Sequence, residues 1–415
     1  MEQIKKKRTR KLDLLLVLVL LVLARICCPA LSNIPLFNMT FTFIYGVAFI
    51  FLYLLSAKKI KIKDFSLVLA AVVYTAYVLL RGFFADKGLF AREPFNAYII
   101  VFLTMIYIWV KGQPLKIKAF LFKFILATLI FDYVYSIIVL FFDPNASRLA
   151  AATNLLQGSP YDILNAVGSF DAVYGGLFVI VILICMRQSL KKKKVKNKLS
   201  LLVLLLALAF ILMSAYGTAL VLLTVALALL LARKSKAFSL ILLLIIAGVL
   251  IFHEPIGQWI IDLSKGITYS DMISTRVKDI GYMLKTFESA GTYAGETGRT
   301  ARMMWSWETF EKYPIFGGMG MLDAKIGGHS ELFDLLGNFG LIGFACVTAY
   351  FIALYKSIRL SLPSKEMKTC WNIIMLVFIV SSILNPSLYS LQMMPMILMI
   401  ALAPSYAEIC RNKKS

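Results

Sequence analysis

The sequence has few acidic residues and almost no histidine. Its 415 residues include 22 Asp and Glu against 44 Lys and Arg, with only two His, for a formal net charge of +22. It contains no C-x-x-C, H-E-x-x-H or D-x-D pattern, no Walker A loop and no G-x-G-x-x-G loop. These absences argue against a zinc site, a metal-bound sugar nucleotide and a nucleotide-binding loop. We therefore expect neither a cofactor nor a metal.

Apolar residues dominate what remains. They make up 60% of the chain, against about 45–50% in soluble proteins, and the mean hydropathy is +0.81. They fall in long runs without strand-like alternation, which favours membrane helices over a barrel. We predict an all-α polytopic membrane protein with about 12 transmembrane helices. The expected spans are 14–31, 36–56, 65–82, 95–110, 119–141, 171–187, 199–214, 218–232, 237–252, 333–355, 371–384 and 391–407.

Most basic residues fall in alternate loops, the longest run being Lys191–Lys194. Such a bias marks cytoplasmic loops and places both termini inside. It indicates anionic lipid, and no nucleic acid, as the partner of the positive charge. The apolar run Leu14–Leu23 follows a basic N-terminal segment, but no small-residue cleavage site follows it, so we expect an uncleaved first helix.

One long polar loop interrupts the apolar pattern. Residues 253–332 hold 10 of the 22 acidic residues and are expected outside, between spans 9 and 10. The chain then divides into a membrane bundle at 1–252, this loop at 253–332, and spans 10–12 at 333–415. Apolar and charged residues alternate at helical spacing over Trp259–Ser264, Thr275–Phe287 and Thr300–Lys312, which predicts helices lying along the outer membrane surface.

Candidate functional residues lie near the end of this loop. Arg299 and Arg302 are three residues apart, so on a helix they share a face that can bind phosphate. The alternative is a solvated pair bonded to Glu296 or Glu308. Glycines 317, 318 and 320, followed by 327 and 328, allow amides to converge on an anion. The alternative there is a flexible loop.

His329 precedes the tenth span. Ser330 is expected to cap that helix, with Glu331 in its first turn. The positive end of the helix disfavours an imidazolium, so His329 can be a neutral base, although a structural role is the alternative. The other histidine, His253, has no such context and is interpreted as structural.

Two features inside the spans remain. Asp132 in span 5 is expected to pair with Arg25 or Arg81, and Lys123 can snorkel to the surface. Glycines 337, 340 and 343 recur every three residues in span 10, which favours close helix packing.

The stretch from Arg299 to Gly343 resembles the O-antigen ligase and O-antigen polymerase superfamily of bacterial envelope proteins. The resemblance rests on Arg299, Trp305, Pro314–Gly318, and His329-Ser330 leading into Gly337–Gly343. The predicted topology also agrees. The sequence departs from the family at three places. After the proline, where the family's glycines usually alternate as Gly-x-Gly, Met319 holds the second place between Gly318 and Gly320, and Ser330 stands where Asn is frequent. The outer turn Ser214–Thr218 lacks the family's arginine, which Arg302 or Arg276 could replace.

The resemblance implies a glycosyltransferase of the cell membrane, inverting and independent of metal. It would take a glycan from undecaprenyl pyrophosphate or a similar polyprenyl carrier to an acceptor hydroxyl at the outer face. His329 would be the catalytic base, and Arg299, Arg302, Gly317, Gly318 and Gly320 would bind substrate. Other polysaccharide-assembly proteins are the implied partners.

Three readings stay open. The first is a membrane glycan polymerase or ligase. The Lys-rich, His-poor composition is typical of a low-GC genome, which favours polymerisation of capsule or exopolysaccharide over ligation to a different acceptor. A transporter or flippase of lipid-linked sugars fits the number of spans, but the halves show no internal similarity. A structural or sensory membrane protein is the third reading.

Overall fold

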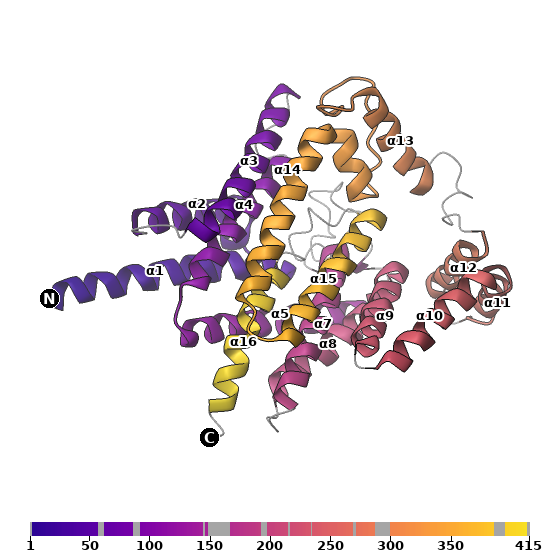
Figure 1. Ribbon diagram of the computed structural model, residues 1–415, viewed down its shortest axis with the longest axis horizontal. Helices are drawn as coiled ribbons and strands as arrows, with labels where there is room; N and C mark the ends of the chain where they lie inside the picture. Colours follow the sequence, from indigo (N-terminus) through magenta and orange to yellow (C-terminus); the bar gives the residue numbers. More distant parts are fainter. Residues whose placement is uncertain are drawn as a thin grey trace.

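The computed structural model describes residues 2–56, 62–85, 92–143, 146–147, 167–191, 197–214, 216–233, 235–268, 271–286, 299–385 and 395–412. Throughout these ranges the regular structure is helical and no strand occurs (Figure 1). The α-helices are α1 (Glu2–Cys27), α2 (Met39–Ser56), α3 (Ile62–Phe84), α4 (Arg92–Lys111), α5 (Leu115–Phe142), α7 (Phe170–Lys191), α8 (Lys198–Ser214), α9 (Gly217–Ala232), α10 (Lys236–Ile251), α11 (His253–Lys265), α12 (Asp271–Thr286), α13 (Arg299–Lys312), α14 (Glu331–Ser361), α15 (Lys365–Leu384) and α16 (Pro395–Asn412).

The bundle is apolar both inside and outside. The helix α7 is mostly buried and packs against α8, α15 and α16. Large apolar side chains also cover the outer surface: Phe83 is 72% exposed, Phe142 81% and Leu360 81%. An aqueous surface rarely carries so much exposed apolar area, whereas a bilayer solvates it. The protein is therefore membrane-embedded.

A helix lies over each of the predicted spans. In the described part of the chain, five helices (α3, α5, α7, α14 and α15) are long and apolar enough to cross a membrane, while α2, α4, α8 and α9 are apolar but shorter. The all-helical membrane class is thus confirmed. The count of twelve spans, the side of each loop and the side of the termini stay predictions.

The helix α14 is broken at Gly340. This residue has φ 61° and ψ −164°, which separates a short part, 331–339, from a long part, 341–361 (Figure 1). The predicted tenth span, 333–355, is therefore divided into two helical parts. Gly337 and Gly343 do serve close packing, since an added Cβ would lie 2.7 Å from the Ser306 carbonyl oxygen and 2.9 Å from the Tyr77 ring, respectively.

The segment 314–319 fills the break. The amides of Gly318 and Met319 donate to the carbonyls of Gly337 and Asn338, at 2.7 and 3.2 Å. The amides of Leu341 and Ile342 donate to the carbonyls of Pro314 and Ile315, at 2.8 and 3.2 Å. A broken helix leaves carbonyls at one new end and amides at the other, and both sets need partners within a membrane. This segment supplies them.

Replacing Gly340 by alanine should destabilise the protein. A Cβ there would lie 2.4 Å from the Ile315 carbonyl oxygen, and the positive φ adds strain of about 1–3 kcal/mol. Thermal unfolding in detergent should show a lower midpoint than for Gly248→Ala, where a Cβ meets nothing within 4 Å. Equal midpoints would contradict this account of the break.

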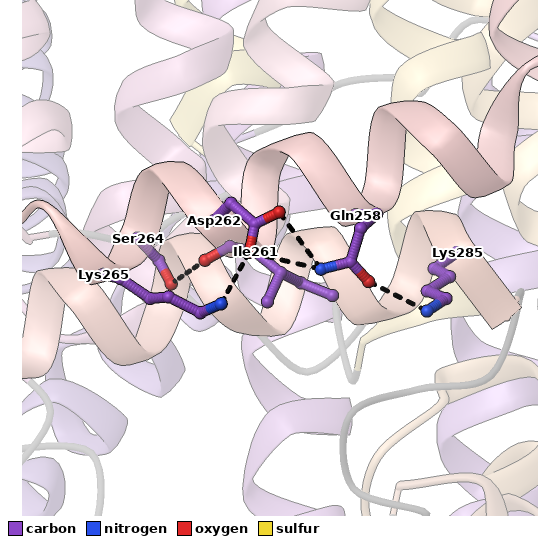
Figure 2. A network of polar contacts seen from close by, with 6 residues as sticks. All are labelled: Gln258, Ile261, Asp262, Ser264, Lys265 and Lys285. Atoms are coloured by element: carbon purple, nitrogen blue, oxygen red, sulfur yellow. Dashed lines mark hydrogen bonds and ion pairs between the residues drawn. The ribbon is translucent and has the colours of Figure 1, made fainter.

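The long polar loop begins with two of the predicted helices, which pack against each other as a hairpin. Gly257 of α11 and Gly281 of α12 let the two backbones meet, because a Cβ on Gly257 would lie 2.6 Å from the Gly281 carbonyl oxygen. Figure 2 shows polar contacts along this hairpin: Lys285 donates to Gln258 at 2.9 Å, and Lys265 contacts Asp262 at 2.6 Å. His253 Nδ1 lies 3.1 Å from the Leu284 carbonyl oxygen, which places this histidine in the contact between the two helices.

Candidate functional site

The segment after Gly320 runs back along α13. Thr309 Oγ1 donates to the Lys325 carbonyl at 2.8 Å, and the Gly327 amide donates to Ser306 Oγ at 2.9 Å. At Gly327 the two backbones nearly touch, since a Cβ would lie 2.0 Å from the Arg302 carbonyl oxygen. This antiparallel path carries His329 to the position of Arg302 on the helix.

Arg302 and His329 form a direct contact. Arg302 Nη1 lies 2.8 Å from His329 Nε2. A guanidinium donates hydrogen bonds and cannot accept them, so Nε2 must be the acceptor. The ring in this contact is therefore neutral, with its proton on Nδ1. A neutral His329 was predicted from the helix end, and the Arg302 contact also favours it; the protonation state itself stays a prediction.

The lone pair that a base would use is thus covered by Arg302. Arg302 Nε is itself buried and has no hydrogen-bond partner among the residues that the structure describes. The guanidinium therefore has donor capacity left for another acceptor. Chemically, the pair combines an anion-binding group with a base whose lone pair becomes available when the arginine moves.

Asp334 holds the loop that carries His329. Its carboxylate, which is buried, accepts hydrogen bonds from Ser306 Oγ at 2.6 Å and from the amides of Gly328 and Ser330 at 3.1 and 3.2 Å. The carboxylate thus ties α13, the loop and the first turn of α14 together. The sequence interpretation missed Asp334 and Ser306. The available signal was a second acidic residue, Asp334, three positions after Glu331 at the start of the tenth span.

Ser330 does not cap α14 with its side chain as predicted. It occupies the N-cap position with φ −142° and ψ 117°, but it makes no side-chain cap. Its hydroxyl instead donates to the Ile383 carbonyl near the end of α15, at 2.6 Å. Glu331 does lie in the first turn and is buried, and its amide donates to the Asn385 carbonyl. These contacts fix His329 beside the end of α15.

Removing the Asp334 carboxylate should destabilise the site. Asp334→Ala leaves one hydroxyl and two amides without their acceptor, each worth about 1–3 kcal/mol when buried. We expect a lower midpoint of thermal unfolding and lower activity. Asp323→Ala is the control. Asp323 is exposed beside Lys312, whose hydrogen bond is the main cause that lowers its pKa. Similar losses in both variants would contradict a specific role for Asp334.

Arg299 is the first residue of α13, three positions before Arg302, as the helical spacing predicted. Its side chain lies outside what the structure describes, as does that of Arg276 in α12. Their expected contacts with a donor stay predictions.

The three predicted anion-binding glycines lie away from the Arg302–His329 contact. Gly318 packs against Thr309, seven residues along α13 from Arg302, or about 10 Å at the helical rise. The amides of Gly317 and Gly318 donate to the carbonyls of Tyr313 and Gly337, so they serve the fold here. Gly317 and Gly320 have φ of +78° and +86°, which explains glycine at both positions.

Two side chains of α3 bond to the backbone of the segment 314–319 and of the short part of α14. Arg81 donates to the carbonyls of Gly317 and Met319, at 3.0 and 2.9 Å. The Tyr77 hydroxyl lies 3.1 and 2.8 Å from the carbonyl oxygens of Phe316 and Phe339 and shares its one proton between them. The suggested pairing of Arg81 with Asp132 is therefore wrong. Arg81 instead satisfies carbonyls at the helix break.

Asp132 is buried in α5, and its charged neighbour is Arg25 of α1, the other partner that was predicted. Lys123, in the same helix, is exposed, which agrees with snorkelling.

Within the described ranges, no three His, Cys, Asp or Glu side chains gather as a metal-binding group. No known protein-family model matches the chain, and no curated protein matches it significantly in sequence. The fold and the contacts of the site therefore carry the functional argument.

Proposed function

We propose that this protein transfers a glycan from a polyprenyl-pyrophosphate carrier to an acceptor hydroxyl at the outer face of the cell membrane, with both termini cytoplasmic. The favoured reaction is polymerisation of capsule, exopolysaccharide or O-antigen repeat units. The observation that carries the proposal is the 2.8 Å contact between Arg302 and His329, beside a broken helix of a membrane bundle.

The chemistry is a single displacement. The acceptor oxygen forms a bond to the anomeric carbon, and the bond from that carbon to the pyrophosphate oxygen breaks. His329 Nε2 takes the acceptor proton. Arg302, with Arg299 on the same helix face, stabilises the charge that develops on the leaving pyrophosphate. The anomeric centre inverts, and the lipid pyrophosphate departs as an anion.

The Arg302–His329 contact supplies an order of events. While Arg302 donates to Nε2, His329 cannot accept a proton there. The pyrophosphate of the donor is a stronger acceptor for a guanidinium than a neutral imidazole is. Donor binding therefore draws Arg302 onto the phosphate and exposes the base. The enzyme becomes competent only once its donor is bound.

A gel profile of surface polysaccharide from cells that lack the protein tests this function. Cells complemented with the parent sequence should make long chains, and cells with the empty vector should accumulate single lipid-linked repeats on the outer face. Long chains that accumulate on the lipid carrier in the empty-vector cells would instead indicate a ligase. Single repeats confined to the inner face would indicate a flippase and contradict the proposal.

A further inference from the structure

A cavity of about 660 Å³ lies between α14 and α15, the two helices that run side by side next to the site (Figure 1). This volume is within the range of small-molecule pockets. Its walls are almost entirely apolar and include Leu335, Val347, Phe351, Met375, Phe378 and Ile379. Both helices are long and apolar enough to cross a membrane, so the cavity lies within the bilayer region. We refer to it as the α14–α15 groove.

One end of the groove meets the candidate site. Glu331 and Leu332 line this end, and they follow His329 directly after Ser330. Along α14, the lining then continues from Phe344 to Tyr355, about 16 Å at the helical rise. At the far end Tyr355 donates a hydrogen bond to Asn372 at 2.8 Å. The groove is thus an apolar channel that starts beside the Arg302–His329 contact.

The apolar lining of the groove indicates which class of molecule can bind there. Ile352, Leu376 and Ile379 line the groove while about half of each side chain is exposed, so the groove opens towards the surrounding lipid. A sugar or an extended peptide would bury polar groups there without partners. A hydrocarbon chain has no such cost. A chain that lies in the groove also brings its headgroup past Glu331 to Arg302, the cationic side of the site.

We propose that the α14–α15 groove binds the isoprenoid chain of the lipid-linked donor, with the pyrophosphate held at Arg302. The inference rests on the proposed function, because it takes the donor class from there. Glu331 marks the end of the apolar part: its carboxyl is buried at the N-terminus of α14, where the helix dipole offsets its charge.

Photolabelling of the full-length protein in lipid nanodiscs tests this placement. The probe is an undecaprenyl pyrophosphate that carries a diazirine in its chain. We expect adducts on α14 and α15 within 344–355 and 372–383. Thr348→Trp fills the groove and should lower these adducts about tenfold, a loss of about 1.4 kcal/mol in binding. Ala349→Trp, the next residue, is exposed and outside the lining, so it should label like the parent.

Three outcomes would overturn the placement: adducts spread evenly over the bundle, equal labelling of the two tryptophan variants, or quantitative Thr348→Cys cross-linking between two copies. Glycan transfer is measured in the same samples with lipid-linked repeats as donor. A parent protein that labels in the groove but transfers nothing contradicts the proposed function and not the groove. Transfer without any difference between the two tryptophan variants contradicts the groove alone.

Discussion

Replacing His329 by alanine is expected to slow glycan transfer by about 10²–10⁴-fold, the usual contribution of a positioned general base. The loss should fall on kcat, because the imidazole acts on the acceptor proton and contributes little to the binding of the donor. The protein should still fold, because Asp334 holds the backbone of this loop through the Gly328 and Ser330 amides. Single-turnover transfer from a lipid-linked repeat measures the effect.

The other histidine provides a matched control. His253 lies on α11 and contacts backbone carbonyls of α12, so His253→Ala should change stability more than kcat. Both variants are compared at matched expression and with their unfolding midpoints measured. A His329→Ala protein that folds like the parent and transfers at the parental rate would contradict the assignment of the base.

Replacing Arg302 has the second largest expected effect. Arg302→Ala removes both the shield on His329 and a cation for the leaving group, and should lower kcat by about 10²–10³-fold. Arg302→Lys keeps a charge but loses the planar fork of donors, so it should recover only part of the rate. Lys312→Ala is the control on the same helix, because Lys312 is exposed and bonded to Asp323.

The coverage of His329 Nε2 by Arg302 can be measured without an activity assay. Diethyl pyrocarbonate acylates an imidazole nitrogen that has a free lone pair, and mass spectrometry separates the adducts of the two histidines. In the parent, His329 should react slowly because Arg302 covers Nε2, and Arg302→Ala should raise its reactivity several-fold. Inorganic pyrophosphate should raise it in the parent. Equal reactivity in the parent and in Arg302→Ala would show that the contact is not formed in the membrane.

The sequence predicted the helical parts of this fold because long apolar runs and helical spacing are local signals. The expected range 300–312 for a helix in the polar loop is close to the observed α13, Arg299–Lys312. The sequence also indicated Arg302 and His329 as candidate site residues, and the structure brings them into contact across 27 positions of the chain. Their contact depends on the return path through Lys325 and Gly327, which a sequence pattern alone does not specify.

The break in α14 could not be predicted from the glycine pattern. Glycines 337, 340 and 343 have the spacing of a packing face, and two of them serve it. Gly340 instead adopts a positive φ because the segment 314–319 supplies partners for both ends of the break. Such a non-local exchange of hydrogen bonds leaves no periodic signal. The same holds for Arg81, whose acceptors lie 236 and 238 positions away.

The most direct test of glycan transfer uses the purified protein in liposomes, with lipid-linked repeats extracted from cells that lack it. Release of polyprenyl pyrophosphate is measured together with growth of the glycan. The parent should release one lipid pyrophosphate for each repeat added, and the His329→Ala and Arg302→Ala proteins should release almost none. Movement of the intact lipid-linked repeat across the bilayer, without any release of pyrophosphate, would contradict glycosyl transfer and identify a transporter.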